Sequence, residues 1–425
     1  MDYFLRMLLR LEDFSRTRNL AGSKALFRMA QSFVNRNPYL RLQAISQFLV
    51  NFRRNPFSTR LIQKAIRTAE RITDRDKFKV KDDDKLGRSI IVKEYIGPNE
   101  RGALVISFET ELMKIVSSPY FSQIENEYQI IFIPSWQPFY SPSLFMLAAK
   151  AEREFFLMPS SILDMPLCEG LGKRCVGLPF HAASWVNADL YPEQRARKDI
   201  DIVMLANFNT YKRHWRLFEA LGDLPRNLKV CLAGVPIGNR TQKSLLREAR
   251  AFGVDNRFQI FEGLNDEEIK QLLSRAKIFC ALSHKEGSYI AVAESLMAGT
   301  PVGMYNDALI GTKTYINKET GILFDPKQSL AQQIIRFLET SEQLDPATWA
   351  RDNISARVNS EWLNRMLMER ALAGDNPWTR HIEPFYSKRF DFYYYRGTEA
   401  EKEYAKSVDA FADKFGLIIE RPVYS

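Results

Sequence analysis

Short apolar runs recur through the central part of the chain, and most are separated by segments whose apolar residues have helical spacing. The first series comprises 89–95, 103–108, 129–135, 154–160 and 174–180, and the second comprises 201–207, 229–234, 257–263, 278–283, 301–306 and 321–324. Buried strands that alternate with amphipathic helices are typical of a parallel sheet with crossover helices. The pattern therefore predicts two doubly wound α/β domains.

A polar stretch, residues 187–199, separates the two series and contains Pro192. We interpret it as an interdomain link, with an amino-terminal Rossmann-like domain over 76–190 and a carboxyl-terminal one over 191–345. Ligands of doubly wound sheets bind outside the carboxyl ends of the strands. Chemistry is therefore expected in the loops that follow the apolar runs, in a cleft between the domains.

The two ends of the chain follow other patterns. Residues 346–425 predict helices followed by an aromatic and charged extension. Residues 1–75 predict helices, because apolar residues such as Phe4, Leu5 and Leu8 recur at helical spacing with arginines between them.

Charge is concentrated in the first of these segments. The net charge is +9, and residues 1–80 hold 17 Lys and Arg against 6 Asp and Glu. One interpretation of residues 1–75 is a helical cap with a solvated basic face. Another is contact with an anionic membrane surface, with the apolar face inserted among lipids. No nucleic-acid partner is predicted, because no recognised binding motif accompanies the charge.

Composition indicates a soluble globular protein of 425 residues, with 45% hydrophobic and 26% charged residues. No apolar run approaches the roughly 20 residues that span a bilayer, and charged residues interrupt the apolar start. We predict a cytoplasmic location, with peripheral attachment at the inner face of the membrane as its extension. The four cysteines form no CxxC pair and are interpreted as buried free thiols: Cys168, Cys175, Cys231 and Cys280.

The most informative motif follows the apolar run 278–283. Glu286 and Gly287 lie in the loop at the predicted strand end, Ser288 is positioned to cap the next helix, and Glu294 lies inside that helix. Glycine lets backbone amides approach a ligand, and a helix start offers N–H groups to a diphosphate. A carboxylate accepts from paired hydroxyls. These features together favour a nucleotide-sugar site.

The motif, with the wording EG…ESLMAGTPV, resembles the E-x7-E region of retaining family-4 (group 1) glycosyltransferases. TGILFDP at 320–326 and the stretch 177–192 fit the family's order. The resemblance covers about 180–340, is weak over 76–180 and is absent over 1–75. It implies the α/β GT-B fold, in which two Rossmann-like doubly wound domains face each other across a cleft, here with an added amino-terminal helical segment.

The resemblance also implies roles for individual residues. Glu294 would bind the nucleotide ribose, and Glu286 would face the donor sugar at the reaction centre. Gly287, Ser288 and Tyr289 would supply backbone contacts to sugar and phosphate.

Lys212, in ANFNTYKRHW, matches the family lysine that holds the diphosphate. Its charge would offset the charge that develops on the leaving nucleoside diphosphate. The family usually has a Gly-Arg pair at the end of the preceding strand, where this chain has Ala206-Asn207. Asn207 is therefore expected in the donor site without a cation; either Arg213 or His214 would compensate, or the activity would be low.

The acceptor side is less clearly marked. Trp136 follows an apolar run in an aromatic stretch, so it fits either sugar stacking or interdomain packing. His181 lies near the link and fits either a cleft role or a structural one. Residues 81–85, KDDDK, contain the letters of a metal-binding DxD motif but precede a strand. We therefore predict no essential metal and no cofactor.

The implied activity is a retaining sugar transfer of the hexosyltransferase type, from a nucleotide diphosphate sugar to a hydroxyl acceptor. The expected acceptor is a glycan or lipid-linked glycan in polysaccharide biosynthesis. Two alternatives remain open. A GT-B nucleotide-sugar epimerase would need acid and base groups around the sugar, and 76–180 contains no histidine. A non-catalytic GT-B binding protein would fit the missing cation at Asn207.

Overall fold

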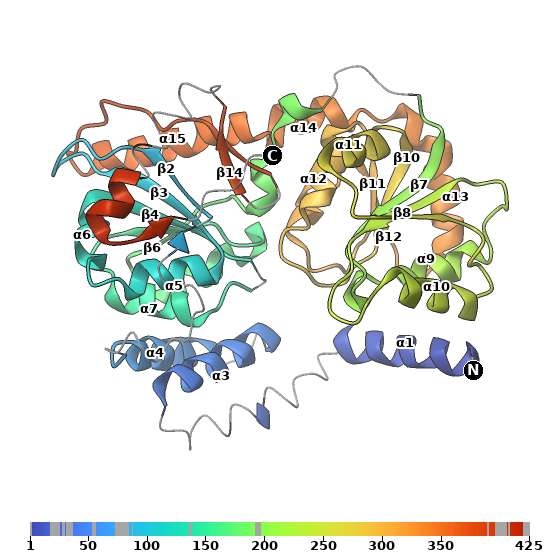
Figure 1. Ribbon diagram of the computed structural model, residues 1–425, viewed down its shortest axis with the longest axis horizontal. Helices are drawn as coiled ribbons and strands as arrows, with labels where there is room; N and C mark the ends of the chain where they lie inside the picture. Colours follow the sequence, from blue (N-terminus) through green and yellow to red (C-terminus); the bar gives the residue numbers. More distant parts are fainter. Residues whose placement is uncertain are drawn as a thin grey trace. The chain divides into compact units, whose positions relative to one another are not determined.

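The computed structural model describes residues 2–17, 26–27, 30, 37–52, 57–72, 85–86, 88–135, 138–191, 197–388, 391–395, 406 and 409–419. The chain divides into two compact units (Figure 1). Unit 1 comprises Met1–Leu20 and Ala188–Ser355, and unit 2 comprises Ala21–Asn187 and Ala356–Ser425.

Unit 1 contains a six-stranded parallel sheet in the order β12-β11-β10-β7-β8-β9. Its strands are β7 (Ile200–Leu205), β8 (Val230–Gly234), β9 (Gln259–Glu262), β10 (Ala276–Ala281), β11 (Val302–Tyr305) and β12 (Gly321–Phe324). The chain runs outward from β7 to β9, then returns to β10 beside β7 and runs outward to β12. The strand order therefore reverses between β7 and β10, and this switch point is where doubly wound sheets bind ligands.

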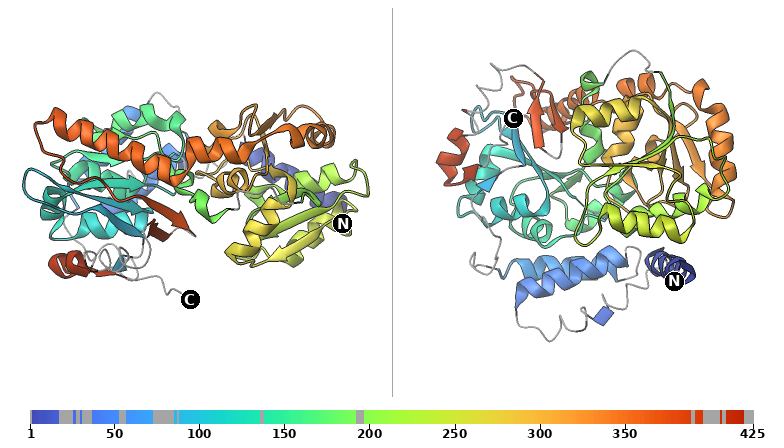
Figure 2. Two further views of the ribbon diagram at one scale, coloured as in Figure 1. Left: turned by 90° about the horizontal axis from the view of Figure 1, so that it is seen from above. Right: turned by 45° about the vertical axis from the view of Figure 1, so that its right-hand side comes forward.

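Helices cover this sheet, as Figures 1 and 2 show. They are α9 (His214–Leu221), α10 (Gln242–Ala251), α11 (Asp266–Ser274), α12 (Ile290–Met297), α13 (Leu330–Thr340) and α14 (Pro346–Ile354). The central strand β10 is an apolar run with Ile278, Phe279 and Cys280 fully buried. Such near-continuous apolar strands are expected where helices cover both faces of a parallel sheet.

The amino-terminal helix α1 (Asp2–Thr17), dark blue in Figures 1 and 2, belongs to unit 1 and packs beside α10. The next helices described in full, α3 (Pro38–Asn51) and α4 (Ser58–Ala69), belong to unit 2. The compact units thus separate parts of the segment 1–75 that the sequence analysis treated as one. They also assign residues 356–425 to unit 2.

Unit 2 contains a five-stranded sheet in the order β2-β3-β4-β5-β6, parallel except for β2. Its strands are β2 (Ser89–Lys93), β3 (Gly102–Ser107), β4 (Tyr128–Ile133), β5 (Phe155–Leu157) and β6 (Cys175–Gly177). Alternate residues of β3 enter two cores: Leu104 and Ile106 face one, Ala103 and Val105 the other. All eleven strands of the two sheets lie at the apolar runs predicted from the sequence.

The two cores of unit 2 are built by different helices. The first includes α3, α4, α5 (Glu109–Ser117), α6 (Phe121–Glu127) and α7 (Pro142–Lys150). The second includes α15 (Ala356–Ala373) and the hairpin of β13 (Phe385–Lys388) and β14 (Asp391–Tyr394). Short elements complete the unit: α8 (Met165–Cys168), and β1 (Lys85–Leu86) paired with β15 (Ile418–Ile419).

A buried ion pair beside the sheet of unit 2 also binds the carboxyl-terminal part of the chain through hydrogen bonds. Lys93 Nζ lies 2.9 Å from Glu100 Oε1. Glu100 also accepts hydrogen bonds from the backbone and hydroxyl of Thr379 and from the backbone of Arg380. Burial alone would raise the pKa of Glu100, but the hydrogen bonds from Thr379 and Lys93 outweigh it and lower the pKa to about 2.

All four cysteines are buried and unbridged, as predicted. None of the helices among the described residues combines the length and apolar character that a membrane crossing requires.

Candidate functional site

Two loops meet at the switch point of unit 1. Residues 206–213 follow β7, and residues 282–289 follow β10. Because β7 and β10 are parallel neighbours, with Ile278 opposite Ile202, their carboxyl ends lie at one edge of the sheet. The loops therefore come together although they are separated by some 70 residues of chain.

Lys212 and Glu286 form a buried ion pair between these loops. Lys212 Nζ lies 2.5 Å from Glu286 Oε2, with side-chain exposures of 7% and 9%. The same ammonium lies 3.9 Å from the ring centroid of Tyr289, whose hydroxyl donates to the Leu205 carbonyl. Glu286 Oε1 is buried and has no hydrogen-bond partner within the described part of the chain. The pair thus presents one unused acceptor in a dehydrated position.

The start of α12 has an unusual backbone. Tyr289 is the N-cap residue, and its φ of 54° places it in the left-handed region, which aromatic residues rarely occupy. No side chain caps the helix. The prediction that Ser288 caps it is wrong, because α12 begins at Ile290 and Ser288 lies one residue too early. Ser288 Oγ is buried without a partner among the described residues. The first N–H groups of α12 therefore lack a side-chain acceptor.

Glu294 lies in the middle of α12 and is half-buried. Burial, and secondarily the negative charge of Asp266, raises the pKa of Glu294 to about 7. No other described residue hydrogen-bonds this carboxylate. A partly dehydrated acceptor without a partner suits a ligand that brings hydroxyl donors.

The loop that follows β11 binds the glutamate loop directly. Leu309 accepts from the backbone of Glu286, and Gly311 donates to the carbonyl of Gly287 at 2.9 Å. Thr312 follows Gly311 in the chain, and its Oγ1 is buried without a hydrogen-bond partner among the described residues. The sequence analysis missed this loop. Its position directly after the apolar run 301–306, at the same sheet edge, was the signal that could have found it.

Asn207 is bound within its own loop. Its Oδ1 accepts from the backbone of Asn209 at 3.2 Å, and its Nδ2 donates to the hydroxyl of Tyr211 at 3.1 Å. The amide is neutral, so Asn207 brings no positive charge to the loop. His214 brings none either, because burial, with the nearby Arg240, lowers its pKa to about 3.

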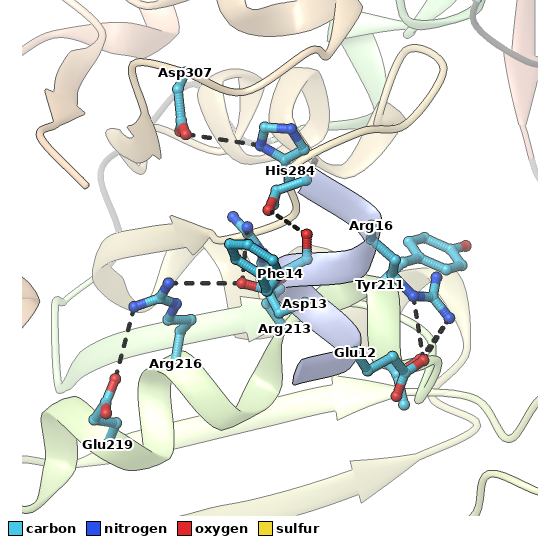
Figure 3. Close-up of polar contacts among 12 residues, drawn as sticks. Glu12, Asp13, Phe14, Arg16, Tyr211, Arg213, Arg216, Glu219, His284 and Asp307 are labelled. Atoms are coloured by element: carbon cyan, nitrogen blue, oxygen red, sulfur yellow. Dashed lines mark hydrogen bonds and ion pairs between the residues drawn. The ribbon is translucent and has the colours of Figure 1, made fainter. Parts of the chain in front are cut away.

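Arg213 forms a bidentate ion pair with α1. Its Nε and a terminal nitrogen donate to the two carboxylate oxygens of Asp13 at 2.5 and 3.0 Å, and Arg216 lies 3.6 Å from the same carboxylate (Figure 3). Arg213 also has a left-handed φ of 59°. A cavity of about 360 Å³ lies here, lined by Arg10 and Asp13 of α1 and by Arg213, Arg216 and Tyr305. The sequence contained no signal for this contact.

The remaining predicted residues lie elsewhere. Trp136 and residues 81–84 fall outside the described residues. His181 is buried in unit 2, and burial lowers its pKa to about 3. Among the described residues, no cluster of three or more His, Cys, Asp or Glu is arranged to hold a metal ion.

Most of unit 1 is similar to a known protein family. Residues 189–348 match the family of group 1 glycosyl transferases. A comparison of the chain with curated proteins finds no match. Among solved structures, sucrose-phosphate synthase from Thermosynechococcus elongatus is 15% identical, over 64% of this chain and 74% of that one, with a TM-score of 0.51. Anabaena HepE in complex with UDP is 14% identical, over 74% and 82%, with a TM-score of 0.50.

A third structure, the pneumococcal O-GlcNAc transferase GtfA in complex with UDP and GlcNAc, is 14% identical, with a TM-score of 0.45. The match spans 62% of this chain and about half (55%) of that protein. At their identities, the likenesses to sucrose-phosphate synthase and HepE establish the fold alone. Both sheets and their helices therefore form the GT-B fold that the sequence predicted.

Proposed function

We propose that this chain, with its group 1 glycosyl transferase domain over residues 189–348, transfers a sugar from a nucleotide diphosphate sugar to a hydroxyl acceptor. The observation that carries the proposal is the Lys212–Glu286 pair, buried beside the uncapped start of α12 at the switch point. Positive charge, free N–H groups and an unused carboxylate oxygen there match the parts of a nucleotide sugar.

In the proposed donor complex, each part of the ligand has its own partners. Glu294 accepts from the ribose hydroxyls. Lys212 and the N–H groups at the start of α12 bind the diphosphate, with backbone contacts from Gly287, Ser288 and Tyr289. The Glu286 oxygen that lacks a partner, Oε1, accepts from a hydroxyl of the donor sugar. Lys212 retains ammonium donors for phosphate while it positions Glu286.

In the proposed reaction, the acceptor oxygen forms a bond to the anomeric carbon and its proton passes to the departing diphosphate oxygen, while the bond from that carbon to the phosphate oxygen breaks. The nucleoside diphosphate leaves with the electron pair, and Lys212 stabilises the charge that develops on it. By its resemblance to family-4 enzymes the transfer is of the retaining, hexosyltransferase type. Lys212 and the helix start supply the positive charge, so the proposed reaction uses no cofactor and no essential metal.

Arg213 and Asn207 complete the proposed donor site less directly. Asn207 orders the loop that carries Lys212 through its bonds to Asn209 and Tyr211. Arg213 adds positive charge beside Lys212, partly neutralised by Asp13. On the acceptor side, Trp136 and His181 remain candidates.

The proposed acceptor is a glycan or a lipid-linked glycan, in polysaccharide biosynthesis. The proposed location is cytoplasmic and peripheral at the inner face of a membrane. The basic residues 1–75 support this part of the proposal, because their charge suits an anionic lipid surface.

Calorimetric titration with a panel of nucleoside diphosphates tests the donor site. UDP is the first probe, because HepE was solved with it. We expect binding by the wild-type chain, weakened in Glu294→Ala and in Lys212→Ala. Lys327→Ala, at an exposed turn after β12, is the matched control. A wild-type chain that binds none of the panel contradicts the proposed activity, and unchanged affinity in both site variants contradicts the site.

A non-catalytic GT-B binding protein is the second candidate. Asn207 favours it, because this neutral residue lies where the resemblance expects an arginine. Arg213, the neighbouring cation, is already ion-paired with Asp13. Donor binding without release of nucleoside diphosphate, with acceptors present, would support this candidate. A nucleotide-sugar epimerase would instead convert the donor sugar without any acceptor, which the same assay detects.

A further inference from the structure

Helix α1 directs an apolar face outward, which is unusual for a helix at a protein surface. Its buried residues are Leu9 and Asp13. Leu9 is buried and Leu5 is partly buried, whereas five of its apolar side chains are exposed by 39% to 76%: Tyr3, Phe4, Met7, Leu8 and Leu11. At 100° per residue, these five fall within an arc of about 140° on the side opposite Asp13. A surface helix normally turns such a stripe toward the core.

Ion pairs hold this orientation. Arg10 lies 2.5 Å from Glu219 of α9, and Asp13 is bound by Arg213. The guanidinium of Arg6 lies over the ring of Phe252, after α10. Figure 3 shows the acidic and basic side chains of α1 and unit 1 facing one another. Arg6, Arg10 and Asp13 of α1 thus contact unit 1, and the apolar face is directed away from these contacts.

The chain that follows this face is strongly basic. Residues 14–69 contain eleven Lys and Arg and no Asp or Glu. Among the described residues, ten of the twenty exposed large apolar side chains lie at or before Phe57, including Leu26 and Phe27. Exposed apolar groups and an excess of basic over acidic residues therefore occur in the same segment.

The geometry points to α1 as a lipid-docking helix, whose apolar face inserts into an anionic membrane surface while its polar face stays bound to unit 1. An anionic bilayer satisfies both features, since its acyl region accepts the apolar side chains and its headgroups neutralise the basic segment. A second copy of this chain would cover the apolar face but would bring two basic segments together, which repel each other. A nucleic acid would match the charge but would leave the apolar face exposed.

A lipid-docking helix would bring the proposed donor site to a membrane. Only this benefit rests on the proposed function; the lipid contact itself does not. Because Asp13 is bound to Arg213, next to Lys212 in the chain, docking through α1 would hold the donor-binding loop close to the bilayer. A lipid-linked acceptor is confined to that surface. The lipid contact itself can be measured without any sugar transfer.

Flotation of the purified full-length chain with phospholipid vesicles tests the inference. The vesicles contain either phosphatidylcholine alone or phosphatidylcholine with phosphatidylglycerol. The test variant is Leu8→Glu/Leu11→Glu. The matched control is Leu372→Glu, because Leu372 is 56% exposed on α15, close to the 54% of Leu11. We expect the wild type and the control to float with the anionic vesicles. The partition of the test variant should fall by at least about tenfold, because two apolar side chains no longer insert.

Three outcomes overturn the inference. The first is equal flotation of the wild type and the test variant, and the second is no flotation of either. The third is a concentration-dependent dimer that Leu8→Glu/Leu11→Glu abolishes while vesicles stay unbound, which would identify a second copy as the occupant. UDP titration and circular dichroism of the same variants show whether the donor site and the fold are intact. Loss of vesicle binding with intact UDP binding would contradict only the lipid contact. Vesicle binding without UDP binding would contradict only the proposed function.

Discussion

The ammonium of Lys212 and the carboxylate of Glu286 lie 2.5 Å apart, in a pair from which water is largely excluded. Two charges withdrawn from water stabilise a fold only modestly, because their desolvation offsets their attraction. Removing one partner leaves the other buried and uncompensated. Each of the two groups therefore depends on the other for its stability in a buried position. This dependence can be measured.

The first prediction concerns this pair. Lys212→Met and Glu286→Gln should each lower the free energy of unfolding, Lys212→Met by about 3–5 kcal/mol, because it leaves a buried carboxylate unpaired. The double variant should regain much of that loss. Denaturant unfolding of all four proteins measures the coupling. Strictly additive effects would mean that the two groups do not interact in solution.

The second prediction concerns the pH dependence of donor binding. The pKa of Glu294 is about 7 in the ligand-free chain, and the ionised carboxylate accepts more strongly from the ribose hydroxyls than the protonated form does. UDP affinity should therefore rise by about tenfold between about pH 6 and about pH 8. In Glu294→Gln, this rise should be absent, whereas Glu361→Gln, an exposed control on α15, should keep it. A pH-independent affinity in the wild type would contradict the assigned role.

The same carboxylate has the opposite effect on stability. A raised pKa means that the folded chain keeps a proton that the unfolded chain releases near its ordinary value of 4.5. Between about pH 4.5 and pH 7, the contribution of Glu294 should therefore become less favourable to folding. Glu294→Gln should remove this loss in pH-dependent thermal unfolding. Bound UDP should offset it.

The third prediction concerns Glu100, whose pKa is lowered to about 2. Its contribution to stability should be complete above its ordinary value of 4.5 and should disappear as the pH falls toward 2. Glu100→Gln leaves Lys93 buried without a counter-charge, so it should destabilise unit 2 by about 3–5 kcal/mol at neutral pH. It should also flatten the acid limb of the stability curve. An acid limb identical to that of the wild type would show that other groups dominate.

The fourth prediction separates the two roles of Arg213. Asp13→Asn and Arg213→Gln should both speed hydrogen exchange of the α1 backbone, because each breaks the bidentate pair. Only Arg213→Gln should weaken UDP binding, since Asp13→Asn leaves the cation in place. Asp255→Asn, which breaks the exposed pair with Arg250, is the control and should change neither readout. Equal UDP affinity in Arg213→Gln and the wild type would remove Arg213 from the donor site.

The sequence alone determined the strands of the two large sheets, but not the β13–β14 hairpin or the β1–β15 pair. Each strand is an apolar run bounded by polar residues, and this signal is local, so all eleven strands of the two sheets could be predicted. Helix–strand alternation implies parallel neighbours, whose carboxyl ends lie at one edge. That pattern places chemistry at the strand ends, whereas Lys212 and the Glu286 loop were assigned to one donor site through the resemblance to the group 1 family.

Only the tertiary structure decided which face of α1 is buried. Its apolar periodicity correctly predicts a helix, but periodicity does not say which face is buried. That choice came from Asp13 and Arg213, which lie 200 residues apart and meet only after unit 1 has folded. The left-handed backbone of Tyr289 is likewise a tertiary result, because it is imposed by packing around the loop rather than by local preference. Periodicity reports local burial, whereas ion pairs between distant residues depend on a fold that no local pattern contains.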